Sequence, residues 1–530
     1  MLNRWRRKTQ FIALFSVLVL LIAACGGGGG ASTSATSSSG GAGTSATTGT
    51  GGAGTSATTT GGGTSATAGA GAATATTGGG GAAATTTGGG AGATAAATTG
   101  GAGAGATTAA TTGAGAGATT AAGGGAAPTV ATCPATAKGA KITMWSPLTG
   151  QDGKFMTELA SKFSSNNPQG VTVSHVAQPD YLTKLQTAAA GKNLPEMTVI
   201  REGDIAGMAV RNIIKPLSAE MNNILGIDKL KADFPPQYWD VGDYKGQHYT
   251  IPLDDHPLVL FYNKDMFQKA GIGAPPKTWQ EFEQDADKLT QNGVMGASIG
   301  TAFDGSTLFQ TLLAQYGGTQ VNQDATEATY NSEAGVKALT YLRDLKKKYS
   351  PKISGTGDPE VTPFRQGKSA MVMHGPWWIS DLEKLPFTGF APVPQLSGGK
   401  KGVWGGSHQL AITTADATKQ AAAACWMSWL SANSVQWAAA GQIPARNSVR
   451  TNGSELQKIA APIAAIAEEA DYSIIPPGGV VDYGPAIFSG GFEPQVDAVL
   501  LGQQQDVKKA LDTAAAKSNQ ILKQNRQRYQ

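Results

Sequence analysis

The hydrophobic and polar positions of this chain divide it into three regions. A predominantly apolar run extends from Phe11 to Ile22, directly after a basic N-terminus. Residues 26–137 are almost entirely Gly, Ala, Thr and Ser, and they contain no charged residue. From Lys138 onward, short apolar runs alternate with stretches in which apolar residues recur at helical spacing. This third region therefore has the pattern of a folded domain that contains both strands and helices.

The first part of the folded region alternates regularly between the two patterns. Short apolar and β-branched runs predict strands at 141–145, 171–173 and 197–200. Helical spacing of apolar residues predicts helices around 155–163, 181–190 and 205–210. Such alternation is typical of an α/β lobe with a mainly parallel sheet.

The stretch 249–290 has the sharpest element boundaries. Its pattern predicts two strands and a short helix, at 249–251, 258–262 and 264–270. Thr278 and Glu281 then form a capping box, which begins a helix that runs to about Thr290. Further on, the pattern predicts one strand at 369–373 and helices near 306–316, 332–348, 417–439, 455–469 and 505–525.

Charge and length narrow the class of protein. Four of the 41 Lys and Arg residues lie in the first eight positions, so the rest of the chain carries 37 cations against 37 Asp and Glu. A domain with balanced charge offers no basic field for nucleic acid. The roughly 390 residues after position 137 are too many for one core and suit two lobes.

The N-terminus resembles a bacterial lipoprotein signal. Basic residues precede the apolar run, and Ile22-Ala23-Ala24-Cys25 ends it with small residues and a cysteine. The resemblance implies that residues 1–25 are the signal with its lipobox and that the Cys25 sulfur carries diacylglycerol, usually with an acyl chain such as palmitate on the amine. The alternative, a transmembrane anchor, fits less well because the run is shorter than the ~20 residues that span a bilayer.

Residues 26–137 are predicted to form a disordered tether, because a Gly/Ala/Thr/Ser chain buries too little apolar surface to offset the entropy of ordering it. A flexible chain of this length reaches roughly 60 Å. Glycan attachment to its threonines is left open. The chain has three cysteines. Cys133 and Cys425 could pair, but a buried free thiol at Cys425 is favoured.

Motif searches give no support for catalysis, a metal or a cofactor. The segment Gly367-Lys368-Ser369 lacks the first glycine of a phosphate-binding loop and precedes a strand. The five histidines show no metal-ligand spacing. Asp254 and Asp255 are neighbours on an extended segment and should point in opposite directions, so a carboxylate that binds a hydroxyl is favoured over an acid/base pair.

Tryptophans in loops are the strongest chemical signal. Four of them follow predicted strand ends beside Ser, Pro or Gly: Trp145, Trp377, Trp378 and Trp404. Flat aromatic surfaces together with carboxylate or guanidinium groups are what a sugar site requires. The alternative, that these indoles belong to the core, stays open for the loop positions. It is the preferred interpretation for three tryptophans of the helix near 417–439, Trp426, Trp429 and Trp437.

The ordered motifs of the folded region resemble the bacterial extracellular solute-binding proteins of family 1, the receptors of ABC importers for sugars and glycerophosphoryl compounds. The matching segments share their order with that family and cover nearly all of 138–530. They are YTIP at 249–252, YNKDMFQKAG at 262–271, PPKTWQEF at 275–282, FRQGKSAM at 364–371, GPWW at 375–378, WGG at 404–406 and GQIPAR at 441–446.

The resemblance implies a periplasmic-binding-protein fold of two α/β lobes with several hinge crossings and a ligand cleft between the lobes. Lobe 1 would comprise about 138–252 and 410–460, and lobe 2 about 253–409 and 461–530. The protein would be a monomeric, lipid-anchored receptor at the outer face of the cell membrane that delivers its solute to a permease. It would bind rather than turn over a carbohydrate, in particular an oligosaccharide. The alternatives are a glycerophosphodiester receptor and a secreted carbohydrate-active enzyme.

The family's cleft residues carry over to loop positions of both lobes. The implied ligand-binding residues are Trp145, Ser146, Asp204 of the Gly203-Asp204 loop, Asp254, Asp255, Trp377, Trp378, Trp404, Gly406 and Arg446.

Overall fold

The computed structural model divides the chain into two units, residues 1–112 and 113–530, and it describes residues 130–355 and 357–529. The expected signal, Cys25 and most of the expected tether lie outside the described residues. Among the helices of the described ranges, none combines the length and the apolarity needed to cross a membrane.

The first sheet contains five strands in the order β2-β1-β3-β12-β6. β1 (Lys141–Ser146) pairs in parallel with β2 (Thr172–Ala177) and with β3 (Met197–Arg201), as the alternating pattern predicts. β12 (His408–Ile412) runs antiparallel to β3 and to β6 (Thr250–Pro252). The sheet is therefore mixed, because β12 enters it from a distant part of the chain and in the opposite direction.

Four of the helices on this sheet lie close to predicted ones, those at 151–166, 181–190, 205–210 and 417–432, whereas the three between 219 and 240 were not predicted. The helices on this sheet are α2 (Gln151–Asn166), α3 (Tyr181–Ala190), α4 (Ile205–Val210), α5 (Ala219–Leu225), α6 (Ile227–Lys231), α7 (Pro236–Asp240) and α14 (Ala417–Ala432). α14 packs against β1 and α5, and its Trp426 is fully buried, 5.3 Å from Phe163 between ring centroids. The interpretation of the tryptophans of this helix as core is confirmed for Trp426.

The prediction of a free thiol at Cys425 is wrong. Cys425 of α14 forms a disulfide with Cys133, and the two Cα atoms lie 5.2 Å apart. Residues 130–137, which composition places in the tether, pack on the same helix: the Ala131 amide donates to Ser428 Oγ, and Ala137 is fully buried. The pairing joins residues 292 positions apart, so no local pattern distinguishes it from a buried thiol.

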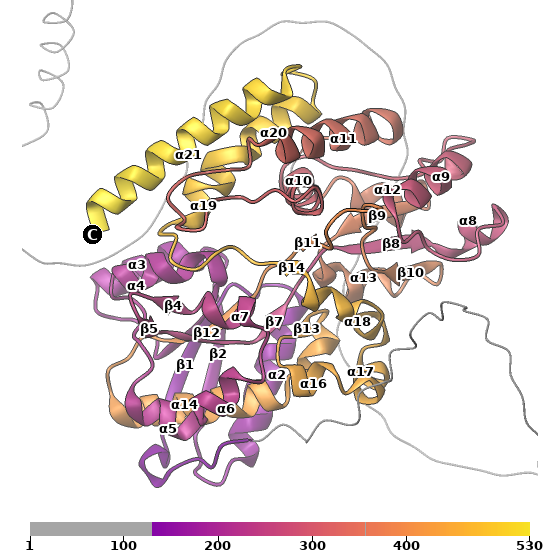
Figure 1. The fold of residues 1–530 in the computed structure, drawn as a ribbon. Coiled ribbons are helices and arrows are strands. Elements are labelled where there is room, and N and C mark those ends of the chain that lie inside the picture. Colours follow the sequence, from indigo (N-terminus) through magenta and orange to yellow (C-terminus); the bar gives the residue numbers. More distant parts are fainter. Residues whose placement is uncertain (1–129, 356, 530) are drawn as a thin grey trace, which may run out of the picture. The chain divides into compact units, whose positions relative to one another are not determined.

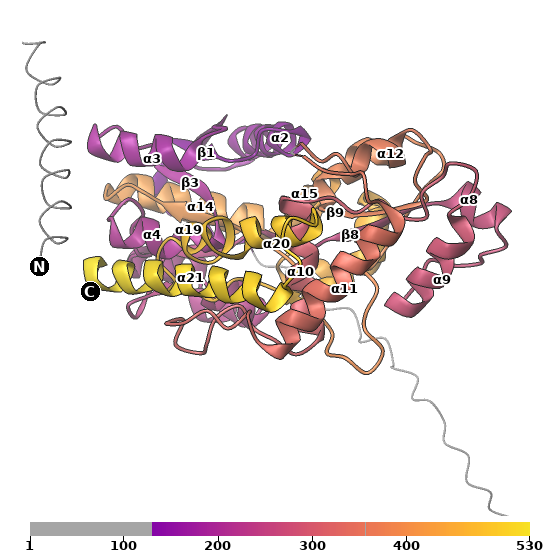
Figure 2. The ribbon, with the colours of Figure 1, turned by 90° about the horizontal axis from the view of Figure 1, so that it is seen from above.

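The second sheet has three antiparallel strands, β10 (Thr388–Ala391), β8 (Val259–Asn263) and β9 (Met371–His374), in that order. Four helices behind it lie alongside one another in Figure 2: α10 (Phe303–Gln315), α11 (Glu333–Tyr349), α20 (Glu493–Leu500) and α21 (Val507–Tyr529). α8 (Lys264–Lys269) and α9 (Trp279–Leu289) follow β8, and the capping box of Thr278 and Glu281 at the start of α9 is confirmed. This sheet and these helices enclose their own apolar core, which includes Trp279 and Phe309.

Shorter elements complete the described chain. They are β4 (Asp243–Tyr244), β5 (Gln247–His248), α12 (Val361–Arg365), α13 (Ile379–Leu382), α15 (Ser434–Trp437), α16 (Asn447–Arg450), α17 (Gly453–Ile459), α18 (Ala461–Ile466) and α19 (Tyr483–Ala486), together with short 3-10 segments.

The two sheets are joined by chain segments that pair with one another. The amides of Leu253, His256 and Leu258 donate to the carbonyls of His408, Gly406 and Trp404, so the segments 253–258 and 404–408 run side by side in opposite directions. β7 (Asp254–Asp255) also pairs with β13 (Ile443–Pro444), and β11 (Val403–Trp404) with β14 (Ser473–Ile474) (Figure 1). Several chain segments that cross from one sheet to the other therefore meet at one place. We call these segments the crossings.

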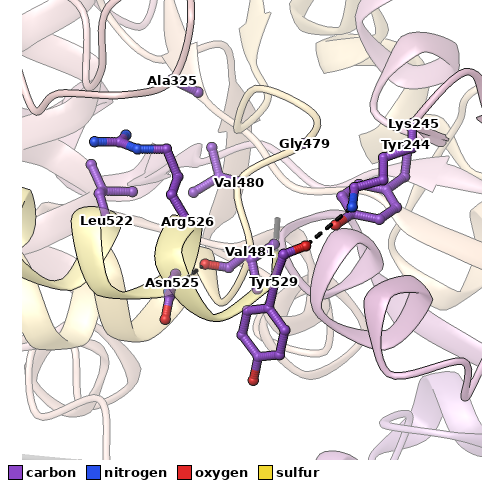
Figure 3. Close-up of a pocket in the computed structure, with 10 residues that line it drawn as sticks. All are labelled: Tyr244, Lys245, Ala325, Gly479, Val480, Val481, Leu522, Asn525, Arg526 and Tyr529. Carbon is purple, nitrogen blue, oxygen red and sulfur yellow. Dashed lines mark hydrogen bonds between the residues drawn. The ribbon is translucent and has the colours of Figure 1, made fainter.

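A cavity of about 180 Å³ lies between the turn that joins β4 to β5 and the C-terminal helix α21 (Figure 3). Lys245 Nζ donates to the Tyr529 carbonyl oxygen at 3.1 Å, and Asn525 Nδ2 donates to the Val481 carbonyl oxygen at 2.9 Å. Arg211, at the end of α4, binds Asp482 through both terminal nitrogens. The bonds of Lys245 and Arg211 hold the first lobe against the second, away from the crossings.

Candidate functional site

Four rings gather where the crossings meet, and we call them the aromatic cluster: Phe303, Trp377, Trp404 and His256. Phe303 lies 5.7 Å from Trp377 and 5.2 Å from Trp404 between ring centroids. His256 lies 6.1 Å from each of the same two tryptophans. Each tryptophan thus contacts both Phe303 and His256. Three of the four rings are partly exposed, as a surface that stacks on a solute requires.

Each ring of the aromatic cluster comes from a different element. Phe303 begins α10, Trp377 lies in the 3-10 helix η3 (Pro376–Trp378) after β9, Trp404 ends β11, and His256 follows β7. The position before Phe303 is strained, since Ala302 has φ 55° and ψ −124° and its amide donates to Asp497 Oδ1. The cluster is therefore assembled by tertiary structure rather than by one motif.

Two glycines make room for these rings. A Cβ atom on Gly375 would lie 2.0 Å from the Trp377 ring, and one on Gly406 would lie 2.2 Å from His256 Nε2. Any other residue at either position would displace the ring. This gives a physical reason for the glycines in the segments 375–378 and 404–406, and it places Gly406 directly at the cluster.

Asp254 lies beneath the cluster and is fully buried. Its carboxylate accepts four hydrogen bonds: from the His408 amide at 2.9 Å, from Nδ1 of His408 at 2.9 Å, from Trp437 Nε1 at 2.7 Å and from His256 Nδ1 at 3.3 Å. Burial opposes its ionisation, but the charge of His408 and the bonds from both histidines outweigh burial and hold the pKa of Asp254 well below its ordinary value.

The two histidines differ in charge. Burial, followed by the nearby charge of His408, lowers the pKa of His256 to about 4. Burial also acts against a charge on His408, but the carboxylate of Asp254 outweighs it and raises the pKa of His408. The two shifts therefore favour a neutral His256 and a charged His408 paired with Asp254.

Asp255 points away from Asp254, which confirms the prediction for neighbours on an extended segment. Its Oδ2 accepts a hydrogen bond from Ser473 Oγ at 2.7 Å, whereas the partners of Asp254 are His256, His408 and Trp437. Burial raises the pKa of Asp255 to about 7. The pair cannot work as one acid/base unit on a single solute, because the two carboxylates face different surroundings.

Two groups of side chains bring three potential metal ligands within 4.8 Å of one another: Asp254, His256 and His408 in one, and Asp358, Glu360 and His374 in the other. In the second group, His374 Nδ1 accepts the Gly375 amide hydrogen, which leaves the ring proton of a neutral imidazole on Nε2. That nitrogen lies 3.3 Å from Asp358 and 3.2 Å from Glu360, but neither contact has the geometry of a hydrogen bond. Hydrogen bonds therefore account for the first group, whereas in the second group His374 Nε2 and both carboxylate oxygens of Glu360 are buried without a hydrogen-bond partner among the described residues.

The structure brings together four of the residues implied by the resemblance: Asp254, Trp377, Trp404 and Gly406. Other members of that set have different partners. Ser146 Oγ lies 2.6 Å from His175 Nε2, and Asp204 accepts a hydrogen bond from the Tyr181 hydroxyl. Trp145, near the end of β1, is partly buried and packs against an apolar cluster that includes Tyr181 and Leu185.

Trp378 and Arg446 also face other groups. The guanidinium of Arg365 lies 4.7 Å from the ring centroid of Trp378. Arg446 is 4% exposed, and its Nε lies 2.6 Å from Asp233 Oδ2. A role for either residue in binding stays a prediction.

Sequence reasoning did not single out Phe303, His256, His408, Trp437 or Glu202. Glu202 accepts the Ser407 amide at 2.9 Å, next to His408, and burial raises its pKa to about 7. The sequence did contain a signal for the two histidines, because His256 lies two residues from Asp254 and His408 two residues from Gly406. No local signal marks Phe303, because a phenylalanine at the start of a helix is ordinary.

The two-lobe α/β fold matches solved solute-binding proteins. The cyclic alpha-maltosyl-1,6-maltose binding protein from Arthrobacter globiformis aligns with a TM-score of 0.60 and 22% identity, over 72% of this chain and 99% of that one. This likeness confirms the two-lobe α/β fold. The chain belongs to the family of bacterial extracellular solute-binding proteins, whose model matches residues 158–464.

Two curated relatives match this chain over a shorter stretch. A putative binding protein of Brucella abortus (strain 2308) is 26% identical over 276 residues, which are 48% of this chain and 64% of the relative. The sn-glycerol-3-phosphate-binding periplasmic protein UgpB of Escherichia coli (strain K12) is 29% identical over 245 residues, 43% of this chain and 55% of UgpB. The chain thus spans less than two thirds of the length of either relative.

Proposed function

We propose that this protein is the extracytoplasmic receptor of an ABC importer and that it binds a neutral oligosaccharide between its two lobes. The aromatic cluster carries the proposal. Phe303, Trp377 and Trp404 offer partly exposed aromatic faces at the crossings, and sugar rings present apolar C–H faces that stack on such surfaces. The name of the Arthrobacter protein, a receptor for a cyclic maltosyl-maltose, agrees with this class of solute.

A glycerophosphodiester is the second candidate, because UgpB, which by its name binds sn-glycerol-3-phosphate, is 29% identical to this chain over 245 residues. A phosphodiester would need a cation free to bind its oxygens. Arg446, the expected phosphate ligand, is buried against Asp233, and the cluster itself contains one neutral histidine. These two observations favour the neutral sugar.

The proposal includes a lipid anchor and a membrane partner. The residues Ile22-Ala23-Ala24-Cys25 support attachment of lipid at the Cys25 sulfur, which would hold the receptor at the outer face of the cell membrane beside its permease. Substitution Cys25→Ala should abolish acyl-chain labelling of the protein in cells. Unchanged labelling in that variant would contradict the anchor without touching the proposal for the solute.

Calorimetry on the purified protein tests the solute class. The panel should contain glucose, maltose, maltotetraose, cellotetraose, mannotriose and glycerophosphocholine. We expect binding of one oligosaccharide with 1:1 stoichiometry, a higher melting temperature in its presence and recovery of the sugar unchanged, because a receptor binds without turnover. Selective binding of glycerophosphocholine would support the second candidate. Release of smaller sugars would contradict a receptor.

A further inference from the structure

Asp254 has no capacity left for a solute. Its two oxygens accept hydrogen bonds from the His408 amide, the Trp437 indole and the Nδ1 atoms of both His256 and His408. The side chain is fully buried. Because protein donors fill its hydrogen-bonding capacity, we expect Asp254 to act through its effect on the protonation of the two histidines.

An ionised carboxylate only accepts hydrogen bonds, so each imidazole nitrogen that binds it must carry the proton. Nδ1 of His408 lies 3.1 and 2.9 Å from the two oxygens, and Nδ1 of His256 lies 3.3 Å from one of them. The two rings are 4.5 Å apart, and one carboxylate neutralises one imidazolium. His408 contacts both oxygens and therefore takes the positive charge. His256 remains a neutral ring with its proton on Nδ1.

The lone pair of His256 then lies on Nε2. This atom makes no hydrogen bond with any residue of the described ranges, and it is not fully enclosed, in contrast to Nε2 of His374. It lies beside Gly406, and the ring stands between Trp377 and Trp404. The aromatic rings around it can stack on a sugar but offer it no hydrogen-bond acceptor. His256 supplies that acceptor.

We propose that Asp254 is a positioning residue, which holds His256 as the Nδ1–H tautomer so that Nε2 accepts a hydrogen bond from a hydroxyl of the solute in the aromatic cluster. The inference rests on the proposed function and narrows its substrate class to a solute with a hydroxyl donor next to a stacked ring face. A site with a buried acceptor discriminates strongly against an analogue that lacks the hydroxyl, because the acceptor is then left unpaired.

The tautomer can be measured without any solute, by ¹⁵N NMR of protein labelled at histidine. Couplings between the C–H protons and the nitrogens of the imidazole ring show which nitrogen carries the proton. The signals that disappear in the His256→Gln variant are those of His256. We expect His256 in the wild type to be neutral with a bare Nε2 at pH 7. A proton on Nε2 of His256 would overturn the proposal, whatever the solute panel shows.

The variant Asp254→Asn tests the positioning role. Its amide can donate to Nδ1, so His256 should change to the Nε2–H tautomer and lose its acceptor. For maltotetraose as the probe, we expect roughly 5- to 100-fold weaker binding. His256→Gln keeps an acceptor near the same place and should bind more tightly than His256→Leu. An unchanged tautomer of His256 in Asp254→Asn, or an equal loss of affinity in the two His256 variants, would overturn the positioning role of Asp254.

Asp243→Asn is the matched control, because Asp243 Oδ1 lies 2.7 Å from His248 Nδ1 in another Asp–His pair, away from the cluster. It should change the His248 signal and leave probe binding unchanged. An equimolar addition of Zn²⁺ checks the alternative use of the same atoms. Broadening or shifts of the His256 and His408 signals together would identify the histidines as metal ligands and overturn the role of His256 as the acceptor of a solute hydroxyl.

Discussion

At the scale of single residues, Phe303 is the side chain that links the two tryptophans of the aromatic cluster on the side of the second lobe. Replacement by alanine removes this stacking surface from a site between the lobes. We expect Phe303→Ala to weaken binding of the identified sugar by about 1–3 kcal/mol, roughly 5- to 150-fold, by analogy with bases stacked on aromatic side chains. Calorimetry with the same sugar measures the change.

Phe390→Ala provides the control for this experiment. Phe390 of β10 is also partly exposed and lies 5.7 Å from Phe261, within the second sheet. Its removal should leave affinity unchanged. If the two variants bind alike, or if Phe303→Ala loses apo stability like an emptied core position, Phe303 is a packing residue and the cluster is not the binding surface.

Arg446, in the segment 441–446, was predicted to bind the solute, but in the structure it pairs with Asp233. Its ion pair with Asp233 is buried on the arginine side, and Asp233 also accepts hydrogen bonds from the amide and hydroxyl of Ser448. Arg446→Met should therefore lower the free energy of unfolding by about 1–3 kcal/mol through loss of the charged partner. Chemical denaturation measures this cost. Weaker sugar binding at unchanged stability would instead support a role in the site.

The sequence predicts a residue of the site where its residue type is unusual for its position. A tryptophan in a loop beside glycine is unusual, so Trp377 and Trp404 stand out in the sequence. Asp254 was predicted as a ligand-binding group, yet in the structure its oxygens bind His256, His408 and Trp437. These partners are up to 183 positions away in the chain. No spacing rule connects such distant residues.

At the scale of elements, periodicity was sufficient for helices and for the parallel strands. α3 and α4 have the predicted bounds, because each is flanked by residues that end a helix or begin a strand. β12 was not among the predicted strands, although all five of its residues are buried. Its neighbours β3 and β6 come from segments more than 150 residues earlier. A strand buried on both faces has no alternating pattern by which it could be found.

The start of α9 gives a quantitative test at this scale. Thr278 Oγ1 accepts the Glu281 amide at 3.2 Å, and the Glu281 carboxylate accepts the amides of Thr278 and Lys277. Thr278→Ala should lower the free energy of unfolding by about 1 kcal/mol, since one amide of the first turn loses its acceptor. Thr278→Ser keeps the hydroxyl and should cost less. Equal costs in urea unfolding would show that the methyl group, rather than the cap, matters.

At the scale of the whole molecule, the crossings determine how the lobes can work together. The segments 253–258 and 404–408 are hydrogen-bonded to each other, and the aromatic cluster lies on them. Under the proposed function, a solute bound there favours the closed arrangement only to the extent that it binds that arrangement better than the open one. The two-lobe architecture followed from length and from ordered motifs, whereas contacts across the lobes depend on packing that no single segment encodes.

The disulfide ties the start of the folded domain to α14. Because Cys133 and Cys425 are 292 residues apart, the link restricts a large part of the unfolded chain. Loss of the bond in Cys133→Ser/Cys425→Ser should lower the free energy of unfolding by about 2–5 kcal/mol. A reductant should lower the melting temperature of the wild type and have no effect on the double variant. Equal melting temperatures for reduced and oxidised wild type would contradict a stabilising bond.

The long Gly/Ala/Thr region should be dispensable for binding, and the structure indicates where it ends. A segment of this composition contributes no packed surface, so deletion of residues 26–129 should leave sugar affinity and melting temperature unchanged. Deletion of residues 26–137 removes eight more residues, among them Cys133 and the buried Ala137. That variant should lose the disulfide and melt at a lower temperature. Weaker binding after the shorter deletion would mean that the region is part of the site or of the fold.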